Sequence, residues 1–280
     1  MRGGKRSLAA LLAALLLLPL AGCGGEAGAV APLELTVLQV GKGDAMVLRC
    51  GGETLVLDAG DAAGGERTLR FLQEQEVRQI DVLILTHFDK DHIGGAPALL
   101  EALPVRRVLL PDYEGEGAAY EALLAALDAA GLTPERLDRA EEFRLGDALV
   151  RVDPPENYRP HGSGEQDNNF CLITTVQHGQ MRLVFAGDAE KRRIRQYLQG
   201  GSQPCDLLKL PHHGSYSAAL ETLVDRLTPG MAVICDSNKA PADSRTLELL
   251  RRRQIPVYET RRGDLVVVSD GQSLRAEQRG

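Results

Sequence analysis

Thr86-His87-Phe88-Asp89-Lys90-Asp91-His92-Ile93-Gly94-Gly95 places two histidines and two aspartates within six positions. The stretch follows the apolar run Asp81–Thr86, which predicts a strand buried on both faces. Loops at the ends of such strands are where α/β folds build functional sites. Histidine and aspartate together suit Zn, Mn or Fe, and the oxygen donors shift the preference toward Mn. The four groups are too closely spaced to face one ion, so pairs pointing to either side of the loop predict two ions.

Three further segments place polar residues directly after an apolar strand. They are Pro211-His212-His213-Gly214-Ser215, Ala186-Gly187-Asp188 and Leu57-Asp58-Ala59-Gly60. An aspartate in the position of Asp188 can bridge two cations. Each segment alone is a weak signal, because aspartate and glycine are common in turns. The four segments in this order predict a dinuclear metal centre.

Short apolar runs alternate with helical segments along the chain. Strands are expected at 33–40, 45–50, 54–58, 81–86, 105–110, 148–152, 170–177, 181–186, 206–210, 231–235, 257–259 and 265–268. Helices are expected at 66–76, 96–102, 118–130, 189–198, 217–227 and 244–253, with a hairpin turn at His178-Gly179. Because no long linker divides the two halves, we expect one α/β domain with helices outside two packed sheets.

Composition excludes several classes of protein. The chain has 280 residues, of which 44% are hydrophobic and 25% charged, which is ordinary for a folded protein and excludes disorder, collagen and coiled coil for the whole chain. Six Tyr, five Phe and no Trp argue against a protein that stacks nucleobases on aromatic side chains. The formal net charge of -7 excludes a globally basic surface, so any contact with nucleic acid would be local.

The cysteines beyond residue 23 do not form a metal-binding pattern. Cys50, Cys171, Cys205 and Cys235 contain no C-x-x-C pair, which argues against a zinc knuckle. Cys171 and Cys235 lie in or beside apolar runs and are expected to be small buried hydrophobic residues. A disulfide is compatible with an exported protein, but the sequence does not assign one.

The N-terminus has the pattern of an export signal. Arg2, Lys5 and Arg6 precede an uncharged run from Ser7 to Leu20, which is shorter than the ~20 apolar residues that span a bilayer. The run ends in Leu20-Ala21-Gly22-Cys23, which resembles a bacterial lipobox, although an ordinary signal peptide with a chance cysteine is the alternative. We therefore expect a lipoprotein signal at 1–22, lipidation of Cys23, a flexible tether at 23–32 and a hydrolase domain at 33–280. The protein would be an extracytoplasmic lipoprotein anchored to a membrane.

The histidine and aspartate pattern resembles a known family. His87-x-Asp89-x-Asp91-His92 is similar to the H-x-[HD]-x-D-H signature of the metallo-β-lactamase superfamily. More closely, the chain resembles the soluble metallo-β-lactamase-like domain of ComEC-type competence proteins. The matching stretches are 40–44, 58–60, 86–95, 168–169, 186–188 and 211–215, within a region from about residue 34 to 268. The resemblance implies a four-layer αββα sandwich.

The resemblance also implies roles for individual residues. His87 and Asp89 would bind one metal ion, Asp91 and His92 the other, Asp188 would bridge them, and His213 would complete the second site. Asp91 is also the candidate catalytic residue that orients the attacking water. Residues expected to support the ligands or contact substrate are Asp58, Asp44, His212, Asn169 and Lys42. The implied cofactors are two divalent ions, Zn or Mn.

Three features depart from the resemblance. Lys42 replaces the usual glutamine in Val-Gly-Gln-Gly-Asp, which would add a phosphate contact or have no effect. A further histidine ligand, common between the first motif and Gly-Asp, has only His161 and His178 as candidates. Asn238-Lys239-Ala240-Pro241 lacks the histidine that ComEC-type domains often carry there, so one metal site could be weaker or the substrate pocket different.

Two bridged cations would activate water for hydrolysis. The competence resemblance implies a phosphodiesterase or nuclease that acts on extracellular DNA, with local basic residues such as Arg192, Arg193 and Arg195 near the substrate. The alternatives are hydrolysis of a lactam, lactone or thioester, and a non-catalytic lipoprotein that binds DNA or a protein partner. Protein partners are not identified by the sequence.

Overall fold

The computed structural model describes residues 30–158 and 166–280. The expected signal peptide, the lipidation site Cys23, most of the tether and His161 lie outside the described residues. Within the described ranges, no helix has the length and apolar composition needed to cross a bilayer.

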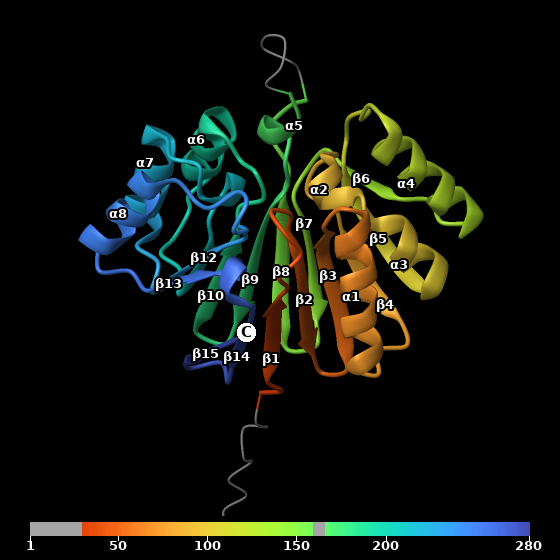
Figure 1. Ribbon diagram of the computed structural model, residues 1–280, viewed down its shortest axis with the longest axis horizontal. Coiled ribbons are helices and arrows are strands. Elements are labelled where there is room, and N and C mark those ends of the chain that lie inside the picture. The colour runs from red at the N-terminus through yellow and green to blue at the C-terminus, as the bar shows by residue number, and fades with distance from the viewer. Residues whose placement is uncertain (1–29, 159–165) are drawn as a thin grey trace, which may run out of the picture.

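Two sheets form the centre of the molecule (Figure 1). Sheet A has the order β15 (Leu274–Arg279), β14 (Asp264–Ser269), β1 (Leu33–Val37), β2 (Ala45–Cys50), β3 (Glu53–Ala59), β4 (Ile80–Ile84), β5 (Val105–Pro111) and β6 (Glu135–Leu137). Sheet B has the order β13 (Val257–Glu259), β12 (Met231–Ile234), β11 (Leu207–Lys209), β10 (Met181–Phe185), β9 (Ile173–His178), β8 (Ala148–Asp153) and β7 (Glu141–Leu145). Strands β3 to β6 are parallel to one another, as are β10 to β13.

Helices cover the outer faces of both sheets (Figure 1). On the side of sheet A lie α1 (Ala62–Glu74), α3 (Ala96–Ala102) and α4 (Ala118–Ala129), and on the side of sheet B lie α6 (Lys191–Gln199), α7 (Ala218–Leu227) and α8 (Ser244–Arg252). Three separate apolar layers result. One lies between the sheets around Leu35 and Phe185, one under α1, α3 and α4 around Leu83, and one under α6 to α8 around Val184. The predicted four-layer αββα sandwich is confirmed.

The parallel strands bring the sequence motifs to one edge of the sandwich. In sheet A, Asp58 is the second-last residue of β3, and His87 follows the end of β4. In sheet B, Asp188 and His212 follow the ends of β10 and β11. Carboxyl ends of parallel strands share an edge, and the loops that follow them are free to carry polar groups. Short helices α2 (Lys90–Ile93) and α5 (Gln166–Asn169) and the 3-10 turn η1 (His212–Gly214) lie at this edge.

Several elements differ from the sequence expectation. The helix expected at 66–76 begins at Ala62, because the Asp61 side chain accepts the Gly64 N–H as an N-cap. The prediction of a hairpin turn at His178-Gly179 is wrong by one residue. His178 is the buried last residue of β9, and Gly179-Gln180 form the turn. Strands β6, β7 and β15 were not predicted, because their alternating exposed residues and charges lack a continuous apolar run.

Two helices approach each other too closely for side chains. A Cβ on Gly95 would lie 2.1 Å from Ala59 O and 2.5 Å from Gly65 Cα. Gly65 is on α1 and Gly95 directly precedes α3, so this contact sets where the Thr86–Gly95 loop rejoins the fold.

We predict that Gly95→Ala lowers the free energy of unfolding by about 1–3 kcal/mol, because backbone would have to move to admit the methyl group. Urea unfolding followed by circular dichroism checks this. The control is Gly200→Ala, where the new Cβ meets nothing closer than 3.4 Å at an exposed helix end. Equal stability of Gly95→Ala and the wild type would show that the contact is not tight.

Candidate metal centre

Three segments of the chain place three histidines and three aspartates together at one edge of the sandwich. His87, Asp89, Asp91 and His92 come from the β4–α3 segment, Asp188 follows β10, and His213 lies in η1 after β11. His87, His92 and Asp188 each offer one ligand atom, and these atoms lie within 4.8 Å of one another. His92 Nε2 is 3.4 Å from Asp188 Oδ1, and His213 Nε2 is 3.1 Å from Asp188 Oδ2.

The remaining two carboxylates lie on the solvent side of this group. His87 Nε2 is 3.5 Å from Asp89 Oδ2, and His213 Nε2 is 3.5 Å from Asp91 Oδ2. The Asp89 and Asp91 side chains are 43% and 24% exposed, whereas the three histidines and Asp188 are buried. The buried histidines and Asp188 therefore close the inner side of the site, and Asp89 and Asp91 line its solvent-exposed side.

The histidine tautomers follow from the hydrogen bonds of their Nδ1 atoms. His92 Nδ1 lies 2.8 Å from Asp58 Oδ2, and His213 Nδ1 lies 3.1 Å from the carbonyl oxygen of Cys235, so both Nδ1 atoms carry a proton. Thr86 Oγ1 donates to Asp58 Oδ2 and so accepts from His87 Nδ1 at 3.0 Å. In the neutral rings, all three Nε2 atoms are therefore left with the lone pair.

Those lone pairs have no hydrogen-bond partner. The Nε2 atoms of His87, His92 and His213, and Asp188 Oδ1, are buried without one among the described residues. Buried polar groups are ordinarily satisfied, and a bound cation would satisfy this converging set of nitrogen and oxygen atoms. Imidazole nitrogen together with carboxylate oxygen is the donor set of Zn and Mn sites. The residues present therefore fit two divalent ions, with His87, His92, His213, Asp89, Asp91 and Asp188 as candidate ligands.

Asp58 joins the end of β3 to the segment after β4 that carries His87 and His92. Its Oδ1 accepts the Thr86 N–H at 2.7 Å, and its Oδ2 accepts both Thr86 Oγ1–H at 2.8 Å and His92 Nδ1–H. Asp58 has a φ of 56°, a left-handed conformation that is unusual outside glycine. The arrangement matches the role that the sequence predicts for Asp58, an acceptor that orients a ligand.

The second histidine motif is also strained. His212 and His213 are consecutive left-handed residues with φ values of 48° and 52°. Such strain persists where the surrounding structure fixes it and is common at functional sites. The turn directs His213 inward and leaves His212 half-buried at the rim, where its Nδ1 is 3.4 Å from Glu190 Oε1.

Carboxylates dominate the electrostatics of the metal-free site. Burial would lower the pKa of His92, but Asp188, Asp58 and Asp44 outweigh it and raise that pKa well above its usual range. Burial is likewise outweighed at His213 by the adjacent carboxylates of Asp188 and Asp91, which raise its pKa. Burial alone would raise the pKa of Asp188, but the neighbouring His92 and His213 hold it well below the usual value.

Asp44 lies deeper than the ligands and has a buried partner that the sequence did not predict. Lys209, the last residue of β11, is fully buried and its Nζ donates to Asp44 Oδ2. Burial would lower the pKa of Lys209, but Asp44 raises it above its usual value, so the ammonium stays charged. The signal that could have revealed this pair is a lysine inside the apolar run Leu207–Leu210, directly before the second histidine motif.

The remaining predicted residues lie around the rim or behind it. Lys42 Nζ is 3.8 Å from Asp91 Oδ2, and the lysine side chain is 46% exposed. Asn169 is buried, and its Oδ1 accepts the Arg193 N–H at 3.2 Å, so it engages α6. Asn168 Nδ2 donates to Glu190 Oε1 at 3.1 Å, beside His212.

Two expectations from sequence are corrected at this point. Arg193 cannot contact a substrate, because it is buried and its guanidinium donates to the carbonyl oxygens of Cys171 and Asp153. His178 is not near the metal centre, since its ring nitrogens lie 2.8 Å from Ser269 Oγ and 2.9 Å from Ala31 O at the other end of the strands. Cys50, Cys171, Cys205 and Cys235 are buried and unpaired.

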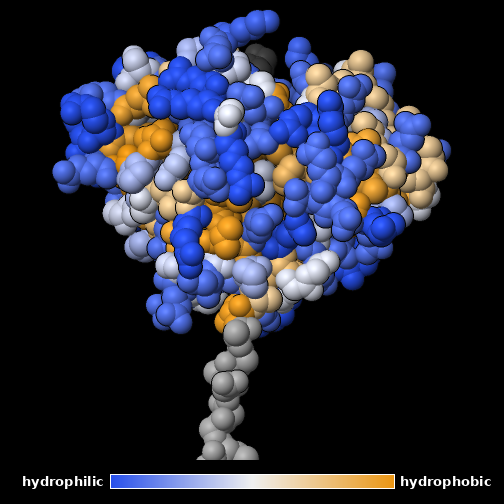
Figure 2. Space-filling model, turned by 60° about the horizontal axis from the view of Figure 1, so that its bottom comes forward, coloured by the Kyte–Doolittle hydropathy of each residue, from blue (hydrophilic) through white to orange (hydrophobic). Residues whose placement is uncertain are grey.

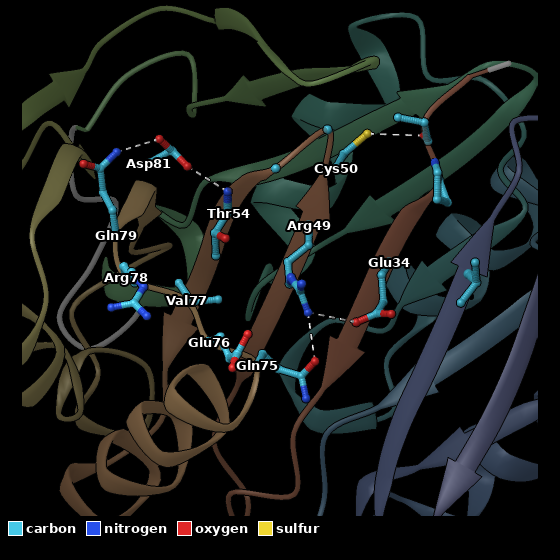
Figure 3. A pocket seen from close by; sticks show the side chains of 15 residues that line it. Glu34, Arg49, Cys50, Thr54, Gln75, Glu76, Val77, Arg78, Gln79 and Asp81 are labelled. Carbon is cyan, nitrogen blue, oxygen red and sulfur yellow. Dashed lines mark hydrogen bonds and ion pairs between the residues drawn. The ribbon is translucent and has the colours of Figure 1, made fainter. Parts of the chain in front are cut away.

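A polar cavity of about 710 Å³ lies at the opposite end of sheet A from the metal centre. Figure 3 shows its side chains around the beginnings of β1, β3 and β4 and the end of β2. Arg49 contacts Gln75 and Glu34, while Asp81 accepts the Thr54 N–H. These pairings stabilise the strand ends, and no metal-ligand group of the described residues lies among them.

The sequence profile of the Metallo-beta-lactamase superfamily matches residues 38–235. The chain belongs to the metallo-β-lactamase superfamily. Proteins with this fold are generally metal-dependent hydrolases, and the fold implies divalent metal ions. The matched range contains all six candidate ligands, although their individual roles and their division between two ions stay predictions.

Curated relatives include competence proteins. The chain is 28% identical over 249 residues to ComE operon protein 3 of Bacillus subtilis, covering 81% of this chain and 32% of that protein. It is 26% identical over 224 residues to Competence protein ComA of Neisseria gonorrhoeae, covering 78% of this chain and 29% of that protein. The chain thus spans about a third of the length of these relatives. The predicted resemblance to ComEC-type proteins is confirmed.

A solved structure supports the fold. The metallo-beta-lactamase fold protein YhfI from Bacillus subtilis superposes with a TM-score of 0.59 at 14% identity, covering 85% of this chain and all of that one (100%). At this level of identity the similarity concerns the fold alone.

We predict that metal binding releases protons and weakens as the pH falls. The raised pKa values of His92 and His213 mean that the metal-free protein holds protons that a metal ion must displace. Their protonation also stabilises the metal-free fold, fully below a pH of about 6.5 and less as the pH rises through the raised pKa values. Calorimetric titration with Mn²⁺ in two buffers of different ionisation enthalpy measures the release. A binding enthalpy that is the same in both buffers would contradict it.

Proposed function

We propose that the protein is a metal-dependent phosphodiesterase that acts on DNA outside the cytoplasm. The observation that carries the proposal is the convergence of three bare histidine Nε2 atoms with the carboxylates of Asp89, Asp91 and Asp188. When bound there, two divalent ions would lower the pKa of water and neutralise charge on a phosphoryl group. The similarity to competence proteins supports DNA as the substrate.

Residues at the open side of the site would handle the substrate. Asp91 is the partly exposed carboxylate next to His213, and it is placed to orient an attacking water and accept its proton. The Lys42 ammonium stands beside Asp91 and would bind a non-bridging phosphate oxygen. Asp89 stands where the signature also admits a histidine, and it makes the ligand set richer in oxygen, which favours Mn²⁺.

The loop that carries Lys42 is rigidly held. Gly41 has a φ of 85°, and a Cβ on Gly43 would lie 2.2 Å from the carbonyl oxygen of Asp91. The same carbonyl accepts the Asp44 N–H at 3.2 Å, so the turn is docked on α2. Lys42 is thereby presented at the mouth of the site at little entropic cost to its backbone.

The first described residues lie at the end of the sandwich away from the metal centre. Ala31 N donates to Asp147 Oδ2 at 2.7 Å, and Ala31 O accepts from His178, both at the end of the sandwich opposite the metal centre. Figure 2 shows this end, where hydrophilic side chains surround separate apolar patches. If Cys23 is lipidated as we propose, the tether would hold this end toward the membrane and the metal centre away from it.

Loss of Asp91 tests the chemistry. We expect the Mn²⁺-loaded full-length protein to cleave single-stranded DNA and bis-p-nitrophenyl phosphate, and Asp91→Asn to be slower by about 10²–10⁴-fold. Asp138→Asn, at an exposed aspartate whose side chain is 66% exposed, serves as the control. The panel includes nitrocefin and a thioester. Turnover of either in place of phosphodiesters would overturn the proposed substrate class, and no turnover of any substrate would favour a binding protein.

Replacing Lys42 separates substrate binding from chemistry. We expect Lys42→Gln to raise KM for DNA by about 10-fold with little change in kcat, because one charge-assisted hydrogen bond of about 1.5 kcal/mol is lost. The matched control is Arg78→Gln, an exposed cation at the opposite end of sheet A (Figure 3). An unchanged KM in Lys42→Gln, or an equal rise in Arg78→Gln, would remove Lys42 from the substrate site.

The anchor can be tested in cells. We expect the wild-type protein to incorporate labelled palmitate and to sediment with membranes, and Cys23→Ser to do neither, because the acyl chains would have no attachment point. Lipid labelling and cell fractionation measure this. Membrane sedimentation of Cys23→Ser at the wild-type level would contradict the lipid anchor.

A further inference from the structure

Lys209 carries a buried positive charge directly beneath the candidate metal ligands. Its side chain is 0% exposed, and taking an ammonium out of water is costly unless it is paired and hydrogen-bonded. Its Nζ donates to Asp44 Oδ2 and to the carbonyl oxygen of Gly187 at 3.2 Å, and lies 3.9 Å from Asp188 Oδ1. The ammonium thus donates to two oxygens and lies near a third, Asp188 Oδ1, at the floor of the site.

The bond to Asp44 connects the two sheets. Lys209 ends β11 of sheet B, while Asp44 directly precedes β2 of sheet A. The backbone of Asp44 is tied to the ligand segments, because its N–H donates to Asp91 O at 3.2 Å and its carbonyl oxygen accepts the Gly60 N–H at 2.7 Å. Lys209 therefore fixes a residue that is already bonded to the loop carrying Asp91.

The Asp44 carboxylate lies under two histidine ligands. Its Oδ1 is 3.6 Å from His213 Nδ1, and its Oδ2 is 3.9 Å from His92 Nδ1. Both Nδ1–H groups already have closer acceptors, so Asp44 acts on them as a nearby charge. A displaced Asp44 would change the field at both rings.

The bond to Gly187 acts on the candidate bridging aspartate. The Gly187 carbonyl oxygen belongs to the peptide group that joins Gly187 to Asp188. It accepts from Lys209 Nζ and also from the His212 N–H at 3.1 Å. This peptide is thereby held from both sides, which sets the direction in which the Asp188 side chain leaves the backbone.

Charge balance adds an independent reason. Five carboxylates surround this region, namely Asp44, Asp58, Asp89, Asp91 and Asp188. Like charges this close together repel one another unless a cation compensates them. The other fully buried basic side chain of the described residues, Arg193, is bonded to carbonyl groups away from the ligands. Among the described lysines and arginines, Lys209 is therefore the fully buried one that lies beside these carboxylates.

We propose that Lys209 is a positioning residue that fixes Asp44 and Asp188 in the geometry required to bind two metal ions. The inference rests on the proposed metal-dependent function but not on the identity of the substrate. It predicts that the neutral, similarly sized pair Lys209→Met with Asp44→Asn keeps the fold and loses metal affinity.

The test uses Mn²⁺ and the full-length protein. Competition with a fluorescent chelator measures affinity, and electron paramagnetic resonance detects the spin-coupled signal of two neighbouring Mn²⁺ ions. We expect the double variant to bind at least one ion about 10–100-fold more weakly, the range found when groups that orient ligands are removed, and to lose the coupled signal. Lys209→Met alone, where it folds, should show the same loss.

Asp81→Asn is the matched control for burial of a carboxylate, because Asp81 is buried at the opposite end of sheet A and accepts the Thr54 N–H. It should lower the melting temperature and leave Mn²⁺ affinity unchanged. A folded double variant with wild-type affinity and the wild-type coupled signal would overturn the role of Lys209 alone. Absence of Mn²⁺ binding by the wild type would instead overturn the proposed function on which the inference rests.

Discussion

The carboxylate of Asp58 is the contact on which the metal centre depends. Three donors converge on its two oxygens, namely the backbone and hydroxyl of Thr86 and the ring of His92. This joins the end of β3 to the loop after β4 and fixes which nitrogen of His92 is free. Through Thr86 Oγ1 it also fixes the tautomer of His87. A buried carboxylate without these donors would be costly, so the fold and the site geometry require each other.

The sandwich explains why the site lies where it does. Each sheet contributes parallel strands that end at the same edge, so β3 and β4 meet β10 and β11 across the inner apolar layer. Histidines and aspartates from both halves then face one another, and Lys209 spans the two sheets beneath them. The opposite edge carries the cavity of Figure 3 and the beginning of the described chain, which leaves the metal centre free of the connection to the N-terminus.

Much of this arrangement could be predicted because strong local signals agreed. The alternating apolar runs predicted one α/β domain with two packed sheets, and the motifs after the strands predicted a dinuclear centre. The family resemblance of these motifs implied the four-layer sandwich and the individual ligands. Burial of single charged residues could not be predicted in the same way. Lys209 sits in a strand that reads as apolar, Arg193 lies in a run of surface-like arginines, and His178 follows polar residues at a strand end. Their environments depend on partners far along the chain, such as Asp44, Asp153 and Ser269, which periodicity does not reveal.

Anomalous diffraction from crystals soaked in Mn²⁺ tests the metal centre most directly. Two peaks roughly 3.5–4 Å apart are expected, the spacing of dinuclear hydrolases. Both should lie within bonding distance of Asp188, and the histidine contacts should come from Nε2 of His87, His92 and His213. A single peak, or ions held through Nδ1 atoms with Asp58 displaced, would contradict a dinuclear centre built on the three free Nε2 atoms.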